Sequence, residues 1–164
     1  MPHVITKILA DDRRFELPDG AGSDAVHSDP QYGYAVTQLI TEDKNQSGTG
    51  IAYTLGGGTH LVQSAIELLS KPLVGQEIEA LMSDFGKVQR AMAEHHQIRW
   101  LGPHKGVIHL ALASITNACF DLWAKARGVP LWKLLLDLSP EALARLIDFS
   151  YLDEVLTADE AVSI

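Results

Sequence analysis

The sequence is poor in cysteine and in positive charge. Cys119 is the only cysteine among 164 residues, which excludes an intrachain disulfide. Its place in an apolar helical stretch predicts a small packed side chain rather than a thiolate nucleophile. Lysine and arginine number 13 against 21 aspartates and glutamates, and the resulting net charge of −8 argues against nucleic acid or an anionic membrane as a partner.

Signals for secretion or membrane insertion are also missing. Residues 1–7 hold no basic segment followed by an apolar stretch, and nowhere do about 18 uncharged apolar residues follow one another. We therefore expect an intracellular protein, cytoplasmic or mitochondrial, without a signal peptide or a membrane partner. With 46% hydrophobic and 21% charged residues, the chain is long enough for one domain-sized core but not for a large enzyme fold.

Three segments in the first third of the chain have the pattern of strands: Val4–Ala10, Tyr34–Thr41 and Gly50–Leu55. Polar turn residues at 42–48 join the second and third segments as a hairpin, so the sequence predicts a small antiparallel meander. Residues 17–33 show neither strand nor helix periodicity and form a long loop. Loops longer than about 12–15 residues are usually functional lids or disordered segments, and composition leaves both alternatives open.

Helical periodicity dominates the rest of the chain. The predicted helices cover residues 61–69, Glu77–Met92, His104–Arg127, Leu131–Leu136 and Pro140–Leu146. Pro72 ends the first helix, Gly128 and Pro130 close the third, and Ser139 is the expected N-cap of the last. The third helix is apolar nearly all round, so we place it in the middle of a bundle. Its polar stripe consists of Ser114, Asn117, Asp121 and Lys125.

Two short motifs suggest further features. Gly56–Gly58, with Thr59 as the expected N-cap, could cradle an anion at a helix N-terminus or serve as a plain hinge. A nucleotide-binding fold built on these glycines would require parallel strands, which a meander does not supply. Near the end, Leu146–Leu152 has the pattern of a strand, and Thr157 with Glu160 has that of a capping box. The chain therefore ends in a β-then-α unit.

Several conspicuous side chains have ordinary explanations. Glu94-His95-His96 is expected to be a solvated helix end, since successive helical residues point about 100° apart and no third ligand is evident. His104 and His109 are five residues apart and so lie on different faces, and Lys105 is expected to be an exposed structural residue. The three tryptophans, Trp100, Trp123 and Trp132, are expected in the core or at a domain interface.

Five motifs in a fixed order carry a family resemblance. They lie at residues 22–32 (GSDAVHSDPQY), 54–59 (TLGGGT), 97–111 (QIRWLGPHKGVIHLA), 121–125 (DLWAK) and 147–152 (IDFSYL). With them the chain resembles the N-terminal capping domain of the enolase superfamily, in its mandelate racemase/muconate lactonizing enzyme-like branch, and within it the L-fuconate dehydratase group. The resemblance covers nearly the whole chain.

The resemblance implies an α+β fold: a three-stranded antiparallel meander with a helical bundle, followed by the first β/α step of an absent (β/α)8 barrel. It divides the chain into a capping domain, 1–140, and the start of a truncated barrel, 141–164. The family's reaction dehydrates a sugar acid to a 2-keto-3-deoxy acid with Mg²⁺. The catalytic residues and metal ligands lie on later barrel strands, so none is expected in this chain, and a complete barrel needs about 250 residues.

The resemblance also implies what this chain would contribute. The loop between the first two strands covers the substrate, and Gly22, Ser23, Asp24 and Tyr32 are its expected substrate-binding residues. Asp24 and Tyr32 suit hydroxyl recognition, and Gly22 allows close backbone approach. Residues 54–59 are expected beside the same site. The expected partners are a sugar acid, the missing barrel and further copies in a homo-oligomer; the alternative is a non-catalytic oligomerisation or sugar-acid-binding module, which would bury Ile147, Phe149 and Leu152.

Overall fold

A computed structural model describes residues 3–27, 31–43, 46–102 and 106–164. Its sheet consists of three antiparallel strands in the order β1-β2-β3: β1 (Ile5–Phe15), β2 (Tyr32–Thr41) and β3 (Ser47–Thr54). The register runs from Phe15 opposite Tyr32 to Lys7 opposite Ile40, with an irregularity between Ile5 and Lys7. The predicted meander is therefore confirmed, and β1 is longer than the sequence pattern indicated.

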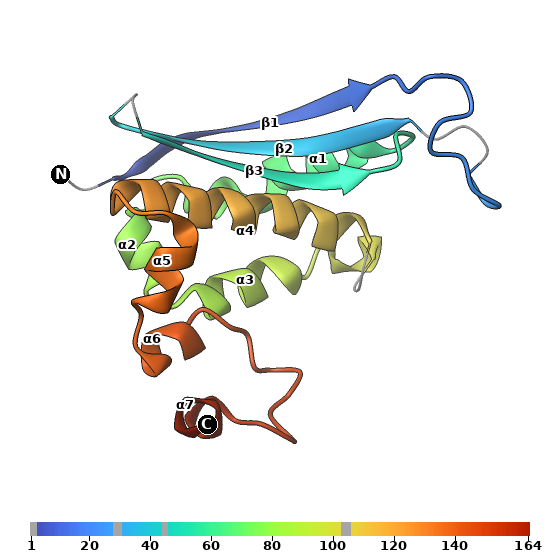
Figure 1. Ribbon diagram of the computed structural model, residues 1–164. Coiled ribbons are helices and arrows are strands. Elements are labelled where there is room, and N and C mark those ends of the chain that lie inside the picture. Colours follow the sequence, from blue (N-terminus) through green and yellow to red (C-terminus); the bar gives the residue numbers. More distant parts are fainter. Residues whose placement is uncertain (1–2, 28–30, 44–45, 103–105) are drawn as a thin grey trace.

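The helices lie on one side of this sheet (Figure 1). The α-helices are α1 (Thr59–Leu69), α2 (Ile78–Met82), α3 (Phe85–Ala93), α4 (Val107–Ala126), α5 (Leu131–Leu136), α6 (Pro140–Ala144) and α7 (Ala158–Ser163). Short 3-10 turns, η1 (Lys71–Leu73) and η2 (Arg99–Leu101), follow α1 and α3. Because β2 and β3 alternate between buried and outward residues, one sheet face joins the helical core and the other faces away from it. The α+β class is confirmed.

The core is centred on α4, as predicted. Ile108, Ile115, Cys119 and Leu122 are completely buried, and they belong to one cluster with residues of the sheet, α1, α2, α3 and α5. By length and composition alone α4 could also cross a membrane, but 56% of that window is buried inside the protein, as in an ordinary core helix. Burial raises the pKa of the Cys119 thiol to about 12, which agrees with a packed, unreactive side chain.

The polar stripe of α4 lies against β3 and binds its backbone. Asp121 Oδ2 accepts a hydrogen bond from the Thr49 amide at 2.7 Å, and Asn117 donates to the Ile51 carbonyl at 3.1 Å. Lys125 Nζ donates to the Ser47 carbonyl at 3.1 Å. These three backbone groups belong to alternate residues of an edge strand, and α4 satisfies the hydrogen bonds that a fourth strand would otherwise make. The helix thus closes one edge of the sheet.

Glycines let α4 approach β3 this closely. A Cβ on Gly50 would lie 2.0 Å from the Ser114 carbonyl oxygen, and one on Gly48 would lie 2.2 Å from the Ala118 carbonyl oxygen. The Ser114 hydroxyl fits between the elements, 2.8 Å from the Thr37 hydroxyl and 3.1 Å from the Gly50 carbonyl oxygen. Any residue other than glycine at position 48 or 50 would separate the helix from the sheet.

Several helix ends follow the sequence, whereas two predicted elements do not. Gly128 has φ +65° beyond α4, the Ser139 side chain caps α6, and Thr157 and Glu160 form the capping box of α7. The helix predicted over Glu77–Met92 is two helices, interrupted at residues 83–84, where Asp84 leaves helical geometry with φ −148° and ψ 50°. The start of the helix predicted at His104 lies outside the described residues, as does Lys105.

The predicted strand Leu146–Leu152 is wrong. This segment is irregular and ends in a turn, in which the Leu152 amide donates to the Phe149 carbonyl at 2.8 Å. In the described part of the chain no strand lies beside this segment. Without a neighbouring strand its backbone groups cannot form the hydrogen bonds of a sheet, whatever its apolar pattern. The prediction for the tryptophans is correct for Trp123, which is buried. Trp100 and Trp132 are 74% and 64% exposed, so they are not core residues of this chain.

Candidate functional site

The candidate site is the loop between β1 and β2, residues 16–31. Residues 16–27 of this loop extend past the end of the sheet and beyond the helices (Figure 1). Gly20 and Gly22 have φ values of +77° and +72°, in the left-handed region that glycine adopts without strain. The Ala21 amide donates to the Pro18 carbonyl at 2.9 Å, so the loop folds through consecutive tight turns. The described residues of this loop therefore form turns and no helix or strand.

Asp24 organises the next turn. Its Oδ1 accepts hydrogen bonds from the Val26 amide at 2.8 Å and the His27 amide at 2.7 Å, and the His27 ring Nδ1 lies 3.0 Å away. The Asp24 amide in turn donates to the His27 carbonyl at 3.0 Å. The amide of His27, then that of Val26, lowers the pKa of Asp24 to about 2. Asp24 therefore carries a full negative charge at neutral pH.

His27 is a residue that the sequence reasoning missed. Its side chain is 43% exposed and lies against a carboxylate that is 61% exposed, so the pair presents an imidazole and a carboxylate together at the surface of the loop. An Asp followed three residues later by His in a loop rich in turn residues was the available signal, because an Asx turn returns the chain to the aspartate oxygens. A hydroxyl group can bind to such a pair, since the carboxylate accepts a hydrogen bond from it.

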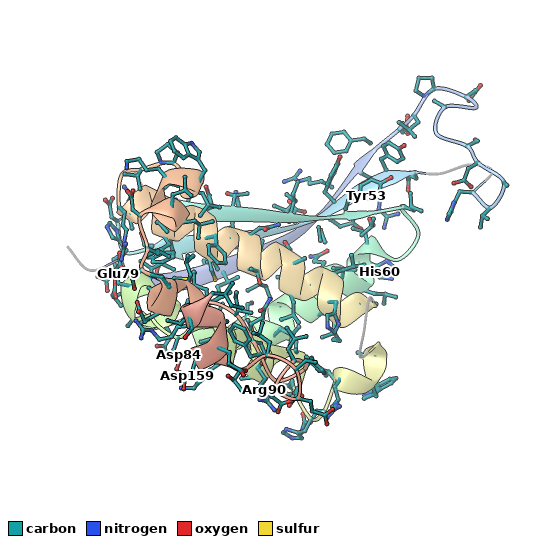
Figure 2. The ribbon with its side chains drawn as sticks, turned by 60° about the horizontal axis from the view of Figure 1, so that its bottom comes forward. Tyr53, His60, Glu79, Asp84, Arg90 and Asp159 are labelled. Carbon is teal, nitrogen blue, oxygen red and sulfur yellow. The ribbon has the colours of Figure 1, made fainter. Side chains whose placement is uncertain are left out.

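Tyr32 lies at the base of the loop in an aromatic cluster. Its ring meets Tyr53 edge to face, with centroids 5.3 Å apart; Tyr53 also contacts Tyr34, which contacts Phe15. Figure 2 shows Tyr53 at the end of the sheet where the loop leaves. Desolvation, followed by the interaction with Tyr32, raises the pKa of Tyr53. Two of the predicted site residues thus belong to separate groups, Asp24 with His27 and Tyr32 with Tyr53.

The second predicted loop packs against the end of the first. A Cβ on Gly56, where φ is +96°, would lie 2.6 Å from the Gln31 carbonyl oxygen. The hydroxyls of Thr54 and Thr59 lie 2.7 Å apart, and a Cβ on Gly33 would approach both within 2.8 Å. The two loops therefore meet at their bases.

The predicted N-cap of α1 needs correction. Gly58, with φ +128°, holds the N-cap position, and Thr59 is the first helical residue. The Thr59 hydroxyl donates to the Gly56 carbonyl at 2.8 Å instead of accepting from the helix, because the hydrogen bond to the preceding turn is available. The wholly antiparallel sheet also excludes the nucleotide-binding fold considered for these glycines.

No metal site forms within residues 3–27, 31–43, 46–102 and 106–164: no group of three or more His, Cys, Asp or Glu side chains in these ranges could hold an ion. His95 and His96, at the end of α3, stack with ring centroids 5.3 Å apart and planes 5° apart. The donor set that Mg²⁺ requires, several oxygens around one point, is not assembled by this part of the protein.

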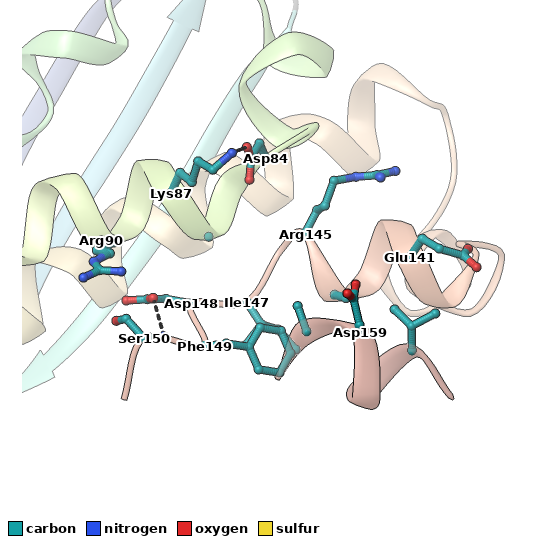
Figure 3. Close-up of a pocket in the computed structure, with 14 residues that line it drawn as sticks. Asp84, Lys87, Arg90, Glu141, Arg145, Ile147, Asp148, Phe149, Ser150 and Asp159 are labelled. Carbon is teal, nitrogen blue, oxygen red and sulfur yellow. Dashed lines mark hydrogen bonds and ion pairs between the residues drawn. The ribbon is translucent and has the colours of Figure 1, made fainter. Parts of the chain in front are cut away.

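A cavity of about 590 Å³ lies between α3 and the segment that follows α6 (Figure 3). Its lining mixes both signs of charge, with Lys87, Arg90 and Arg145 near Asp148 and Asp159. This mixture favours neither anions nor cations. Gly86 holds the segment against α3, since its amide donates to the Arg145 carbonyl at 2.9 Å. The lining comes from α3 and from residues 141–162, the part of the chain that the family resemblance leads us to expect at the start of a barrel.

Curated relatives match almost the whole chain, although no protein-family model matches it. Mitochondrial enolase superfamily member 1 of Bos taurus is 42% identical over 162 residues, which are 98% of this chain and 37% of that protein. L-galactonate dehydratase of Hypocrea jecorina is 40% identical over 162 residues, 98% of this chain and 36% of that protein. This chain thus spans little more than a third of the length of these relatives.

Solved structures agree with the sequence relatives. The crystal structure of human mitochondrial enolase superfamily member 1 superimposes with a TM-score of 0.91 at 39% identity, covering 99% of this chain and 37% of that chain. L-talarate dehydratase from Polaromonas sp. JS666, complexed with Mg and L-glucarate, superimposes with a TM-score of 0.60 at 20% identity, covering 80% and 32%. The second similarity shows a shared fold alone.

Proposed function

Since the chain matches the N-terminal capping domain of the enolase superfamily, we propose that it is the substrate-covering part of a sugar-acid dehydratase. In this proposal residues 16–31 and 54–59 cover a sugar acid that is dehydrated on a (β/α)8 barrel outside this chain. We propose L-fuconate as the substrate, on the strength of the motifs at residues 22–32 and 147–152. The relatives named as dehydratases support the reaction class.

The observation that carries the proposal is the ordered, charged tip of the first loop. A structureless connection would not fix a carboxylate with two backbone amides and an imidazole. In the proposal the Asp24 carboxylate accepts a hydrogen bond from a substrate hydroxyl, and the His27 imidazole lies beside the same group. Gly22 and Ser23 bring the backbone close to the sugar, and Tyr32 offers its hydroxyl from the base of the loop.

The boundary with the barrel is also proposed, with the cap at 1–140 and the start of the barrel at 141–164. Ile147 is 53% exposed and Leu152 is 44% exposed, while Phe149 is half-buried. Apolar side chains left exposed on a segment without a strand partner support a surface that is completed by further protein. An independent binding module would have buried them, so the exposure favours the dehydratase cap over that alternative.

The described residues do not form a metal site, so none of them has a role in holding Mg²⁺ in this proposal. We propose that the Mg²⁺ ligands and the catalytic residues lie in the barrel, as the magnesium held by L-talarate dehydratase supports. A mitochondrial location is proposed from the names of the relatives.

The test joins this chain to the barrel of bovine mitochondrial enolase superfamily member 1, in place of the 162 aligned residues. We expect Mg²⁺-dependent formation of a 2-keto-3-deoxy acid by the joined protein and none by this chain alone. L-fuconate, L-galactonate and L-glucarate are compared as substrates. Turnover by the chain alone would refute the proposal, and turnover of the other acids but not L-fuconate would refute only the substrate.

A matched pair of variants tests the loop. Asp24→Asn in the joined protein should lower kcat/KM roughly tenfold, because a hydrogen bond to a charged acceptor is lost. Asp19→Asn, an equal change at an exposed position of the same loop, should leave kcat/KM unchanged. Equal effects of the two substitutions would contradict the role given to Asp24.

A further inference from the structure

Strand β1 is the open edge of the sheet. The opposite edge, β3, is closed by the polar side chains of α4. The start of β1 is also closed, because the Ile5 amide donates to the Gln76 carbonyl at 2.9 Å and the Ile5 carbonyl accepts from the Gly75 amide at 2.8 Å. From Leu9 to Phe15 no strand lies along the outer side of β1 within the described ranges.

The backbone of this open stretch is oriented for pairing. The Ala10 carbonyl accepts a hydrogen bond from Gln63 Nε2 of α1 at 3.3 Å, so it points away from β2, and a strand that pairs here must displace this one side chain. Backbone groups alternate along an antiparallel strand, and those of Asp12 and Arg14 therefore point outward as well. Residues 10, 12 and 14 thus offer three outward positions for a short ladder. The Ala10 carbonyl oxygen can accept a hydrogen bond from a pairing strand in addition to the one from Gln63.

The side chains of the stretch are complementary to themselves. Leu9, Asp11, Arg13 and Phe15 lie on the outer face of the sheet, where Leu9 is 39% and Phe15 is 55% exposed. Reversing this row places an apolar side chain opposite each apolar one and an opposite charge opposite each charged one. Asp11 and Arg13 already form an ion pair along the strand, and their side chains remain 47% and 67% exposed.

We propose that β1 is a self-association edge, at which a second copy of this chain pairs antiparallel through residues 9–15 about a two-fold axis at Asp12. Each Asp11 then lies opposite Arg13 of the second copy, and each Leu9 lies opposite Phe15 of the second copy. The pairing adds about six backbone hydrogen bonds and makes one continuous sheet of the two meanders.

The two-fold axis and the charges select this register. When the two-fold axis is perpendicular to the sheet, the outer side chains of both copies lie on the same face. Odd-numbered residues of β1 therefore pair only with odd-numbered residues, and even-numbered residues only with even-numbered ones. Moving the axis to Arg13 would put Arg13 opposite itself and Asp11 opposite Phe15. Moving it to Asp11 would oppose two aspartates, and like charges directly across a ladder destabilise it.

The inner face has one like-charged pair, at Asp12, which lies on the axis. Arg14 of the same chain binds that carboxylate through two nitrogens, with Nε 3.0 Å from Oδ1 and Nη2 2.7 Å from Oδ2. This hydrogen bonding lowers the pKa of Asp12 and offsets its charge. Each Asp12 carboxylate therefore faces that of the second copy while it is already paired with Arg14 of its own chain.

Charged residues on an edge strand can also protect a protein against association. Exchanging the charges of Asp11 and Arg13 distinguishes this role from self-association. The experiment measures the mass of the full chain by sedimentation velocity from micromolar to hundreds of micromolar concentration at low salt. We expect twice the 17.9 kDa of one chain at the upper end, and dissociation as salt is raised. Arg13→Asp or Asp11→Arg alone should raise the dissociation constant roughly tenfold or more.

The double variant Asp11→Arg/Arg13→Asp restores opposite charges across the axis and should dimerise like the original chain. Lys7→Asp, the same change of charge on the same outer face but outside the paired stretch, is the matched control and should not weaken the dimer. Circular dichroism verifies that each variant is folded. Protection of the Asp12 and Arg14 amides from hydrogen exchange should rise with protein concentration.

Three results would overturn the proposal. The first is a monomer throughout the concentration series. The second is a dimer unaffected by either single substitution, which would place the contact on another surface. The third is a double variant as weak as the single ones, which would assign the charges to edge protection. Each result leaves the dehydratase proposal untouched, because none of these residues is among those placed in the substrate-covering loops.

Discussion

Replacing Gly50 with alanine should separate α4 from the sheet. A Cβ at this position would lie 2.0 Å from the Ser114 carbonyl oxygen and 2.4 Å from the Ala118 amide nitrogen, both backbone atoms of one helix. An ordinary contact needs 3.4 Å or more, so the helix backbone must move by about 1.4 Å, because a close-packed core has no void to take the methyl group. Neither atom can be displaced by a simple change of rotamer.

The cost has two parts. Overpacking of a core typically destabilises by about 1–3 kcal/mol. The same displacement stretches the hydrogen bonds from Ser114 to Thr37 and Gly50, now 2.8 and 3.1 Å long, beyond hydrogen-bonding range. Leaving such buried groups unpaired costs about 1–3 kcal/mol more. We therefore expect Gly50→Ala to lower the free energy of unfolding by roughly 2–6 kcal/mol, a large part of the about 5–15 kcal/mol usual for a domain.

Urea unfolding, followed by far-ultraviolet circular dichroism, measures this loss. Gly57→Ala is the matched control, because a Cβ at Gly57 meets nothing within 4 Å, and we expect its unfolding midpoint to stay close to that of the original chain. If Gly50→Ala unfolds within about 1 kcal/mol of the control, the close approach of helix and strand is not a rigid requirement, contrary to the packing argument.

Two further predictions concern titration and reactivity. The turn around Asp24 should persist at neutral pH and open in acid. The pKa of the Asp24 carboxyl is lowered from 3.8 to about 2 in the folded protein. The stabilisation is therefore complete above the unfolded pKa and is lost as pH falls through about 2. NMR shifts of the two amides that bind it should follow this midpoint, and a midpoint near 4 would contradict the hydrogen bonds. Cys119 should resist a thiol reagent at pH 8 in the folded protein and react after urea unfolding, since burial raises its pKa to about 12; rapid labelling without urea would show that α4 is not a stable core helix.

Local patterns were enough to predict much of the fold. Alternating residues located the three strands, and the apolar sequence around Cys119 identified the central helix, because burial of apolar surface imposes the period of each element. The Ser139 N-cap and the Thr157 capping box were also predictable, since both are satisfied within four residues. Failures occurred where an element depends on distant partners, as for the predicted strand at Leu146–Leu152.

The candidate site shows the same division. The family motifs identified the loop and its residues Gly22, Ser23, Asp24 and Tyr32, but their roles as substrate contacts stay predictions. The contact of Asp24 with His27 is local and could have been expected from their spacing. Packing of Gly56 against Gln31 could not, because it depends on where the sheet brings two loops together.

By itself, the sequence determined the class of the fold, its central helix and the loop that forms the candidate site, since these follow from apolar periodicity, turn residues and recognisable motifs. Only the tertiary structure decided which sheet edge is closed and which is open. The polar stripe of α4 covers the free edge of β3, whereas no strand pairs with the outer edge of Leu9–Phe15 in the described residues, where Gln63 of α1 reaches only the Ala10 carbonyl. Hydrogen bonds between segments far apart in the chain make this difference, and no local pattern encodes them.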